Sequence, residues 1–520
     1  MAFSDCPLAI DSSFATQNAT GLAFPALGVV RPVNEAEVTA LVRYAREEKI
    51  ALYPISTGRN WGYGSASAMR DRCLIVDLGQ MRAIRQWNPE TGIITLEPGV
   101  SQSMLYEFLQ SHGGEYLVPT TGAGPNCSIV GNALERGFGI TPYCDHFGAV
   151  MSLRAVLPNG KLYTSMFQEH LPPGVQQSFK WGVGPYLDGL FSQGGFGIVT
   201  EMTLSLAPKP EAFEAFFFSL RSASDITAAV EIVRSILKEY GALVGGINLM
   251  NDLRVLSMVA STSETEIPRS RALTMDELNA LKDKQGVAPW TGMGTLYGTA
   301  ETVRAARKAL RRRLKKRFSR VIFLNEAFVK RIKAIAKFVP HVRKTALYAH
   351  LLKAETSLKI LSGVPSQTAL PLAFWRSGGI SAEAASIEID QPEVGLLWYS
   401  PIIPLESSTT VEVAEMIRRV CRRYEIDPLT TLTAFHHTCF DCTVPLIFDR
   451  RDAESVRRAH DCYAELVAEG RKLGAAPYRT GIQGLDLTMA EKSVAAEWIE
   501  DMKALTDPDR IVAPRRYSLR

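Results

Sequence analysis

The stretch Pro54-Ile55-Ser56-Thr57-Gly58-Arg59-Asn60-Trp61-Gly62-Tyr63-Gly64 decides the fold. It continues a short apolar segment, 51–55, that predicts a strand, and it holds three glycines within seven residues. Glycine lets backbone N–H groups converge on an anion and approach it closely. The loop lacks the Gly-Lys-Ser/Thr that closes a P-loop, and no helical pattern follows directly, as a Rossmann fingerprint requires. Taken alone, the stretch predicts either a pyrophosphate site or an ordinary glycine turn.

Two further glycine-rich segments lie in the same half of the chain. One comprises Thr120-Thr121-Gly122-Ala123-Gly124-Pro125-Asn126 and, shortly after it, Gly131-Asn132-Ala133-Leu134-Glu135-Arg136-Gly137-Phe138-Gly139. The other is Gly194-Gly195-Phe196-Gly197-Ile198-Val199-Thr200. Three such segments at loop positions favour a long cofactor that lies across several backbone loops.

The bulk composition excludes several classes of protein. A chain of 520 residues exceeds what one hydrophobic core usually organises, so two domains are expected. The net charge of +4 is too small for nucleic acid to be the main partner. No apolar run is long enough to predict a membrane span, and no secretory signal pattern opens the chain, so we expect a cytoplasmic protein. The single CxxC pair, Cys439 and Cys442, predicts reduced thiols and no metal site.

The composition changes near Pro208-Lys209-Pro210, and strand–helix units recur beyond it. Examples are Phe213–Leu220 before Ser224–Tyr240, Thr291–Tyr297 before Ala300–Phe318, Gly395–Ile403 before Ser408–Tyr424, and Cys442–Phe448 before Ala453–Leu473. This rhythm predicts an antiparallel sheet covered on one face by helices. We therefore expect an α+β protein with domains 1–210 and 211–475, and a segment 476–520 that returns to the first domain.

One expected helix is strongly basic. Its run comprises Arg304, Arg307, Lys308, Arg311, Arg312, Arg313, Lys315, Lys316, Arg317 and Arg320. Such a run is either a solvated helix face or a docking surface for an acidic partner, such as an electron carrier or a membrane surface.

Several motifs together resemble the vanillyl-alcohol oxidase and p-cresol methylhydroxylase family. They are the 56–64 loop, Val130–Gly137 with Thr141-Pro142-Tyr143-Cys144-Asp145-His146, Gly184–Gln193, Pro477-Tyr478-Arg479-Thr480, and Ile511-Val512-Ala513-Pro514. The resemblance spans nearly the whole chain in the family's order. It implies an FAD-binding domain built from the two ends of the chain, with a substrate domain between them.

The resemblance also implies which residues contact FAD. The pyrophosphate would lie on the 56–60 loop, and the isoalloxazine ring would face the second domain. The expected FAD contacts are Ser56, Thr57, Gly58, Arg59, Asn60, Gly64, Thr120, Gly122, Gly131, Asn132, Glu135, Gly137, Gly197, Ile198 and Val199.

In this family a phenolate is held by two tyrosines and an arginine, and the matching positions are Tyr63, Tyr478 and Arg479. A para-substituted phenol loses hydride more easily as the phenolate, which hydroxyl donors and a fixed positive charge stabilise. Arg516 matches a further substrate arginine of the p-cresol branch. His437 and Asp441 resemble an acid–base pair that could relay a proton, although His436 next to it is an alternative.

The sequence departs from the family pattern in three places. The position of the histidine that bonds flavin covalently in several relatives is Leu396, so we expect noncovalent FAD; a link through Tyr399 or Cys127 is the alternative. Thr120 follows Val118-Pro119 where the oxidase branch carries an aspartate, and threonine cannot act as a base. Arg515 stands at a glycine-like position and could alter the entrance.

These expectations lead to an FAD-dependent oxidoreductase that oxidises a small phenol, with oxygen or an electron-accepting protein as reoxidant, and that forms a homodimer. One alternative keeps the fold but takes a hydroxy acid or another alcohol, with Arg479 binding the carboxylate. The other is a flavin-binding protein without turnover that docks through the basic helix.

Overall fold

The computed structural model covers the whole chain and describes most of it. The described residues are those from 5 to 518 except 15–17, 167–170, 172–173, 260–266, 268–269, 339–354, 356–357, 381–383 and 490–492.

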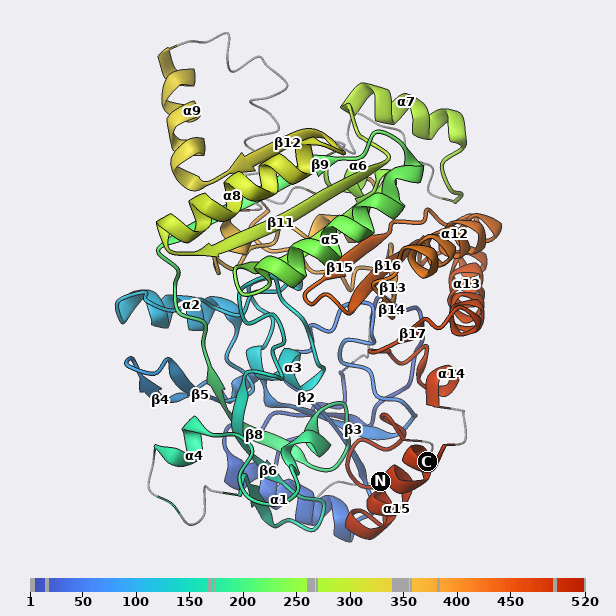
Figure 1. Cartoon of the computed structure of the whole chain (residues 1–520). Helices are drawn as coiled ribbons and strands as arrows, with labels where there is room; N and C mark the ends of the chain where they lie inside the picture. Colours follow the sequence, from blue (N-terminus) through green and yellow to red (C-terminus); the bar gives the residue numbers. More distant parts are fainter. Residues whose placement is uncertain are drawn as a thin grey trace.

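The N-terminal part contains two small sheets, which lie in the lower half of Figure 1. The first is parallel and orders its strands β1 (Gly28–Val30), β3 (Cys73–Asp77) and β2 (Ala51–Ile55). The core of β3 is an almost continuous buried apolar run, as is usual in parallel sheets. Helix α1 (Glu35–Glu47) begins at the Asn34 cap and buries one apolar face. Strand β2 delivers the chain into the 56–64 glycine loop.

The second small sheet is antiparallel and has five strands. Its order is β4 (Ile84–Asn88), β5 (Ile93–Leu96), β8 (Ile198–Ser205), β6 (Val150–Val156) and β7 (Leu162–Thr164). Pro158-Asn159-Gly160 forms the turn between β6 and β7, where an Asn-Gly pair favours a hairpin. Helices α2 (Gln102–Ser111) and α3 (Ile129–Leu134) pack with this sheet in one apolar core.

The middle of the chain builds a nine-stranded antiparallel sheet, seen in the upper half of Figure 1. Its strands are β9 (Ala212–Ser219), β10 (Val244–Asn251), β11 (Trp290–Gly298), β12 (Ser319–Leu324), β13 (Val394–Tyr399), β14 (Pro401–Pro404), β15 (Thr431–Ala434), β16 (Cys439–Asp449) and β17 (Ala476–Pro477). The order is β12-β9-β11-β10-β15-β16-β14-β17, and β13 also pairs with β16. The expected strand 395–403 is therefore two strands, which part at Ser400.

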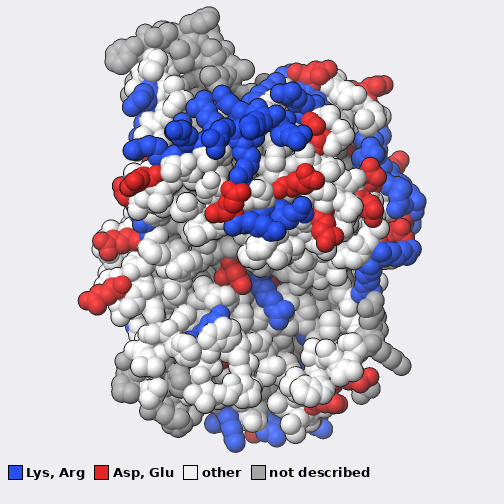
Figure 2. Space-filling model, in the orientation of Figure 1, with Lys and Arg blue, Asp and Glu red and all other residues white. Residues whose placement is uncertain are grey.

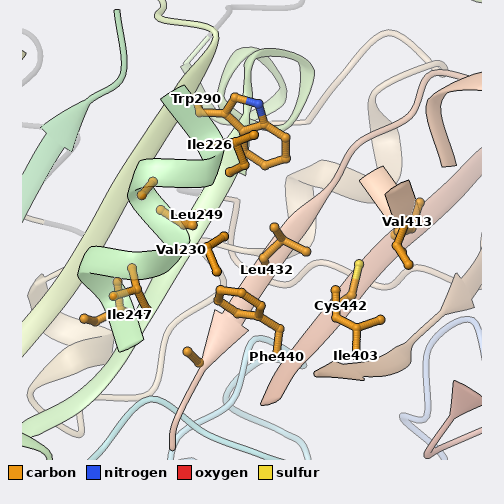
Figure 3. Close-up of a cluster of buried hydrophobic side chains, with 14 of the residues drawn as sticks. Ile226, Val230, Ile247, Leu249, Trp290, Ile403, Val413, Leu432, Phe440 and Cys442 are labelled. Carbon is orange, nitrogen blue, oxygen red and sulfur yellow. The ribbon is translucent and has the colours of Figure 1, made fainter. Parts of the chain in front are cut away.

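Helices cover this sheet with their apolar faces. The four in its main core are α5 (Ile226–Tyr240), α8 (Ala300–Lys315), α12 (Ser407–Arg423) and α13 (Ala453–Lys472). Figure 3 shows the centre of that core, where Val230 of α5 lies by Leu432 and Phe440 of the sheet. Val413 of α12 lies by Cys442 and Ile403. The fold is thus the expected α+β fold. The remaining helices of the region include α6 (Asp252–Val259), α7 (Met275–Gln285), α9 (Glu326–Phe338) and the 3-10 turn η4 (Leu370–Phe374).

The C-terminal segment leaves the large sheet and contacts the parallel one. It carries α14 (Leu485–Met489) and α15 (Val494–Thr506), and Figure 1 shows α15 at the lower end of the molecule. The Leu52 amide donates to the Ile511 carbonyl at 2.7 Å, and the Ala513 amide donates to the Leu52 carbonyl at 2.8 Å. These contacts join residues 511–513 to the parallel sheet. The domain boundaries 1–210, 211–475 and 476–520 stay a proposal. Among the described residues, no helix combines the length and apolar character that a membrane crossing requires.

Candidate active site

A cavity of about 420 Å³ lies where the three parts of the chain meet. Its walls come from the loop after β2, from the 121–138 and 191–199 segments, and from β13, β16 and η4 of the large sheet region. The C-terminal segment closes it with Tyr478, Arg479 and Arg516. Residues separated by more than 400 positions in sequence therefore share one space.

The glycine segments form one side of this cavity. Residues 56–60 line it together with Gly122, Gly131 and Gly197, which present backbone rather than side chains. Gly62 has a φ of +72°, and a Cβ there would lie 2.7 Å from Trp398 Cδ1. Only glycine therefore lets the loop approach β13 this closely. The result is an extended backbone cradle with room for an elongated anionic molecule.

Arg479 is held between the glycine loop and α3. Its Nη2 donates to Asn60 Oδ1 at 2.6 Å, and its Nε lies 4.0 Å from Glu135 Oε2. Its guanidinium carbon lies 4.5 Å from the ring centroid of Tyr63, and Tyr63 Oη lies 2.9 Å from Ser400 Oγ. A cation thus lies over a tyrosine ring at the cavity wall.

Asp441 is a buried acidic group of the cavity wall. It lies on β16 opposite Ile402 and Thr433, and only 8% of it is exposed. Burial raises its pKa from 3.8 to about 7, against the opposing hydrogen bond from the Tyr478 hydroxyl and the charge of Arg479. Its Oδ1 has no hydrogen-bond partner among the described residues. Asp441 can therefore take up or release a proton near neutral pH.

Glu135 neutralises a second arginine. It pairs with Arg516, and Tyr517 Oη donates to its Oε2 at 3.4 Å. Burial alone would raise the pKa of Glu135, but the charges of Arg516 and Arg479 outweigh it and lower that pKa. Glu135 is thus ionised and holds both arginines in place.

Comparison with known proteins decides what this arrangement is. Residues 26–165 match the FAD binding domain family. The chain is 31% identical to 1'-carboxy-chondrochloren decarboxylase of Chondromyces crocatus, over 95% of this chain and 90% of that protein. It is 28% identical to the hydroxylating 4-cresol dehydrogenase flavoprotein subunit of Pseudomonas putida, over 93% of this chain and 86% of that protein. The structure of p-cresol methylhydroxylase with substrate bound superimposes with a TM-score of 0.83 at 26% identity, over 96% of this chain and 91% of that chain.

The chain belongs to the vanillyl-alcohol oxidase and p-cresol methylhydroxylase family. It is accordingly an FAD-dependent oxidoreductase. The expected family, fold and cofactor are confirmed, and the alternative of a flavin-binding protein without turnover is set aside. The glycine cradle fits FAD, because backbone amides and side-chain-free positions face the cavity along its length.

Most of the expected site residues line the cavity of this family member. For the substrate these are Tyr63, Tyr478, Arg479, Asp441 and Arg516. For the cofactor they are Ser56, Thr57, Gly58, Arg59, Asn60, Gly122, Gly131, Asn132, Glu135, Gly197 and Val199. Their contacts with substrate and FAD remain proposals that this placement supports.

Five expected residues lie away from the cavity wall. His437 is half-buried in the turn between β15 and β16, where its ring centroid lies 4.1 Å from that of His436. Thr120 is buried and donates to the Ile360 carbonyl at 2.9 Å. Gly64, Gly137 and Ile198 also lie outside the lining.

The cavity includes residues that the sequence analysis missed. Trp398 lies two positions after Leu396 on β13, so strand alternation places both on the cavity face. Gln193 donates to the Tyr478 carbonyl at 3.1 Å and so supports the tyrosine loop. Arg254 enters from α6, and its sequence context carries no signal for this position.

The groups that could bond flavin covalently are few at this wall. Leu396 occupies the cavity face, and its side chain cannot form such a bond. Tyr399, next on β13, points into the main core, where it is fully buried. Cys127 does line the cavity, but burial raises the pKa of its thiol to about 11, which keeps it protonated.

Proposed function

We propose that this enzyme oxidises a small para-substituted phenol by removing hydride from the carbon attached para to the hydroxyl. The observation that carries the proposal is the cluster of Asp441, Tyr478, Tyr63 and Arg479, which line one cavity and interact with one another. A phenol needs a proton acceptor and donors for its oxygen, and this cluster supplies both. The relative named for 4-cresol supports the same substrate class.

Asp441 is the proposed proton acceptor. With a pKa of about 7 it is a stronger base than an ordinary aspartate, and its free Oδ1 can receive the phenolic proton. Burial raises the pKa of Tyr63 and of Tyr478, so both hydroxyls stay protonated and can donate to the phenolate oxygen. Arg479 adds a fixed positive charge.

The phenolate then pushes electrons toward the para carbon. When bound, FAD accepts the hydride that leaves this carbon. The substrate becomes a quinone methide, and water can add to it to give the alcohol. The residues at the oxygen end stabilise the negative charge that makes this loss possible. Leu396 and the protonated Cys127 support the further proposal that FAD is held noncovalently.

Anaerobic mixing with 4-ethylphenol tests the proposal. We expect rapid bleaching of the flavin absorbance, because hydride transfer needs no oxygen. The matched control is 4-ethylanisole, whose methylated oxygen cannot lose a proton and should leave the flavin oxidised. If no phenol bleaches the flavin while D-lactate or another hydroxy acid does, the hydroxy-acid alternative replaces this one.

A second candidate reaction is the loss of a carboxyl group from the same kind of phenol, because one relative is named as a decarboxylase. A quinone methide with a carboxylate on the neighbouring carbon can release CO₂. The electrons of the broken carbon–carbon bond restore the phenolate and leave a vinyl group. Mass spectrometry of the product from 3-(4-hydroxyphenyl)propanoate separates the two outcomes, since 4-vinylphenol has lost the carboxyl carbon and the hydroxylated acid has not.

We further propose that an acidic electron-carrying protein reoxidises the enzyme. Lys and Arg side chains gather over the upper part of the molecule in Figure 2, where Figure 1 places α8. Arg307 and Arg313 pair with Glu214 and Glu239, but most other cations of the run are exposed. The double change Arg311→Glu and Lys315→Glu should slow transfer to an acidic cytochrome at low salt and leave anaerobic bleaching unchanged. An unchanged transfer rate would exclude this surface.

A further inference from the structure

Four arginines line the cavity, and three of them have an acidic partner. Arg59 lies 2.6 Å from Glu388, while Arg479 and Arg516 share Glu135. The fourth is Arg254, on the first turn of α6. No acid among the described residues forms an ion pair with it.

The side chain of Arg254 is poorly satisfied by the protein. Its Nη1 donates to Ser257 Oγ at 3.2 Å on the same helix, and no other described group bonds the guanidinium. The acid nearest to it in sequence, Asp252, already pairs with Lys282 at 2.8 Å. Most of the five N–H donors of this guanidinium are therefore available to a molecule bound in the cavity.

Arg254 lines the same cavity from α6, whereas Asp441 of the proposed phenol site lies on β16. Burial alone lowers the pKa of Arg254 to about 10, with no contribution from Asp441, Glu135 or Arg479. It therefore remains charged at neutral pH. Leaving such a charge half-buried without a partner is unfavourable, so sites of this kind usually bind an anion.

The wall around Arg254 is apolar. Its helix neighbours Leu253 and Leu256 pack with Leu370 and Leu372 of η4 in one cluster, and both η4 leucines line the cavity. An apolar wall with one fixed cation suits a hydrocarbon chain that ends in an anion, and it is unsuited to a compact inorganic ion. A guanidinium matches a carboxylate through two parallel hydrogen bonds.

We propose that Arg254 binds a carboxylate at the end of the substrate side chain, so that the substrate is an aromatic acid. This deepens the proposed function and rests on it for the identity of the ring. The phenol would lie with its oxygen toward Asp441 and Arg479, and its acidic tail would reach Arg254. The cavity would then select substrates that carry both a phenol and a carboxylate.

Equilibrium binding to the oxidised holoenzyme tests the site without requiring turnover. The probes are 3-phenylpropanoate and its neutral analogue 3-phenylpropanamide, which lack a phenol and cannot be oxidised in the proposed way. Dissociation constants come from the perturbation of the flavin spectrum and from calorimetry. The variants are Arg254→Met, Arg254→Lys and, as a matched control, Arg46→Met on the exposed face of α1.

We expect the wild type and R46M to bind the carboxylate more tightly than the amide. R254M should weaken carboxylate binding about tenfold or more, equivalent to the loss of one charge-assisted contact, and leave amide binding and flavin content unchanged. R254K should retain part of the preference. If the wild type binds the carboxylate and the amide with equal affinity, the proposal is wrong, and no variant is needed to show it.

Two other results would also overturn it. Loss of FAD from R254M and R254K, with normal folding, would make Arg254 a cofactor ligand. If R254M weakens the binding of the carboxylate and of the amide equally, Arg254 contributes only to the shape of the cavity. If phenols fail to bleach the flavin but the carboxylate preference depends on Arg254, the phenol proposal fails and this site stands.

Discussion

Asp441→Asn removes the proposed proton acceptor while keeping the size of the side chain. Burial raises the pKa of Asp441 to about 7, so about a tenth of it is ionised at pH 6 and about nine-tenths at pH 8. If the ionised carboxylate takes the phenolic proton, the rate constant for flavin reduction rises roughly tenfold between these two pH values. In D441N the rise should vanish, and the rate should fall by about 100-fold or more.

Anaerobic stopped-flow mixing with 4-ethylphenol across pH 6 to 9 measures both effects. The matched control is Asp449→Asn at the far end of β16, where the carboxylate pairs with Arg451 at the surface. D449N should keep the wild-type pH profile. A D441N rate within about threefold of the wild type, or a wild-type rate that is flat from pH 6 to 8, would refute Asp441 as the base.

The pH dependence of stability tests the raised pKa of Asp441 without any substrate. The native state binds more protons than the unfolded state between pH 4 and 7, because the pKa of Asp441 is 3.8 when exposed and about 7 when folded. Its contribution to stability is therefore complete below pH 4 and is lost as the pH rises through 7. The difference corresponds to roughly 4 kcal/mol. In thermal unfolding of the holoenzyme, D441N should lack this loss and exceed the wild type in stability at pH 8.

Three further outcomes follow from the same site. Tyr478→Phe should slow anaerobic bleaching by roughly tenfold or more with flavin content unchanged, since one hydroxyl donor to the phenolate is lost; an unchanged rate would remove Tyr478 from the site. Acid precipitation should leave the yellow colour in the supernatant, because Leu396 cannot bond flavin; a yellow pellet would contradict noncovalent binding. Glu135→Gln should lower the unfolding temperature of the holoenzyme, because Arg516 loses its acidic partner. It should also shift the pH profile of bleaching to lower pH, because Arg479 becomes free to pair with Asp441. A profile that stays at its wild-type pH would show that Glu135 has no influence on Asp441.

The cofactor side of the site could be predicted from sequence because it consists of local segments. A glycine loop after a strand has the same backbone geometry wherever it occurs, so residues 56–60, Gly131 and Gly197 were found by pattern and resemblance. The helix and strand rhythm of the middle region was predictable for the same reason. The break at Ser400 was not, because both halves of the apolar run 395–403 continue as strands that pair with β16.

The proposed acid–base pair shows what sequence spacing alone leaves open. His437 and Asp441 are four residues apart, which would bring them together on a helix. Here β16 begins at Cys439, so Asp441 belongs to a strand while His437 lies in the turn before it. A strand advances about 3.3 Å per residue, which carries residues apart instead of stacking them. Arg254 was missed for another reason: it reaches the cavity only through the packing of α6 against η4.

The arrangement of charges around Arg479 explains how one buried site can hold both a cation and a usable base. If Arg479 paired directly with Asp441, the ion pair would hold the pKa of Asp441 low, and the carboxylate would bind a phenolic proton poorly. Asn60 instead engages Nη2 at 2.6 Å, and Glu135 lies 4.0 Å from Nε, so these two groups compete with Asp441 for the guanidinium. Arg479 Nε is itself buried without a hydrogen-bond partner among the described residues, and the charge of Arg479 lowers the pKa of Asp441, but burial outweighs that effect and raises the pKa to about 7. The basicity of Asp441 is thus set first by its burial, and the absence of a direct ion pair with Arg479 among the described residues preserves it.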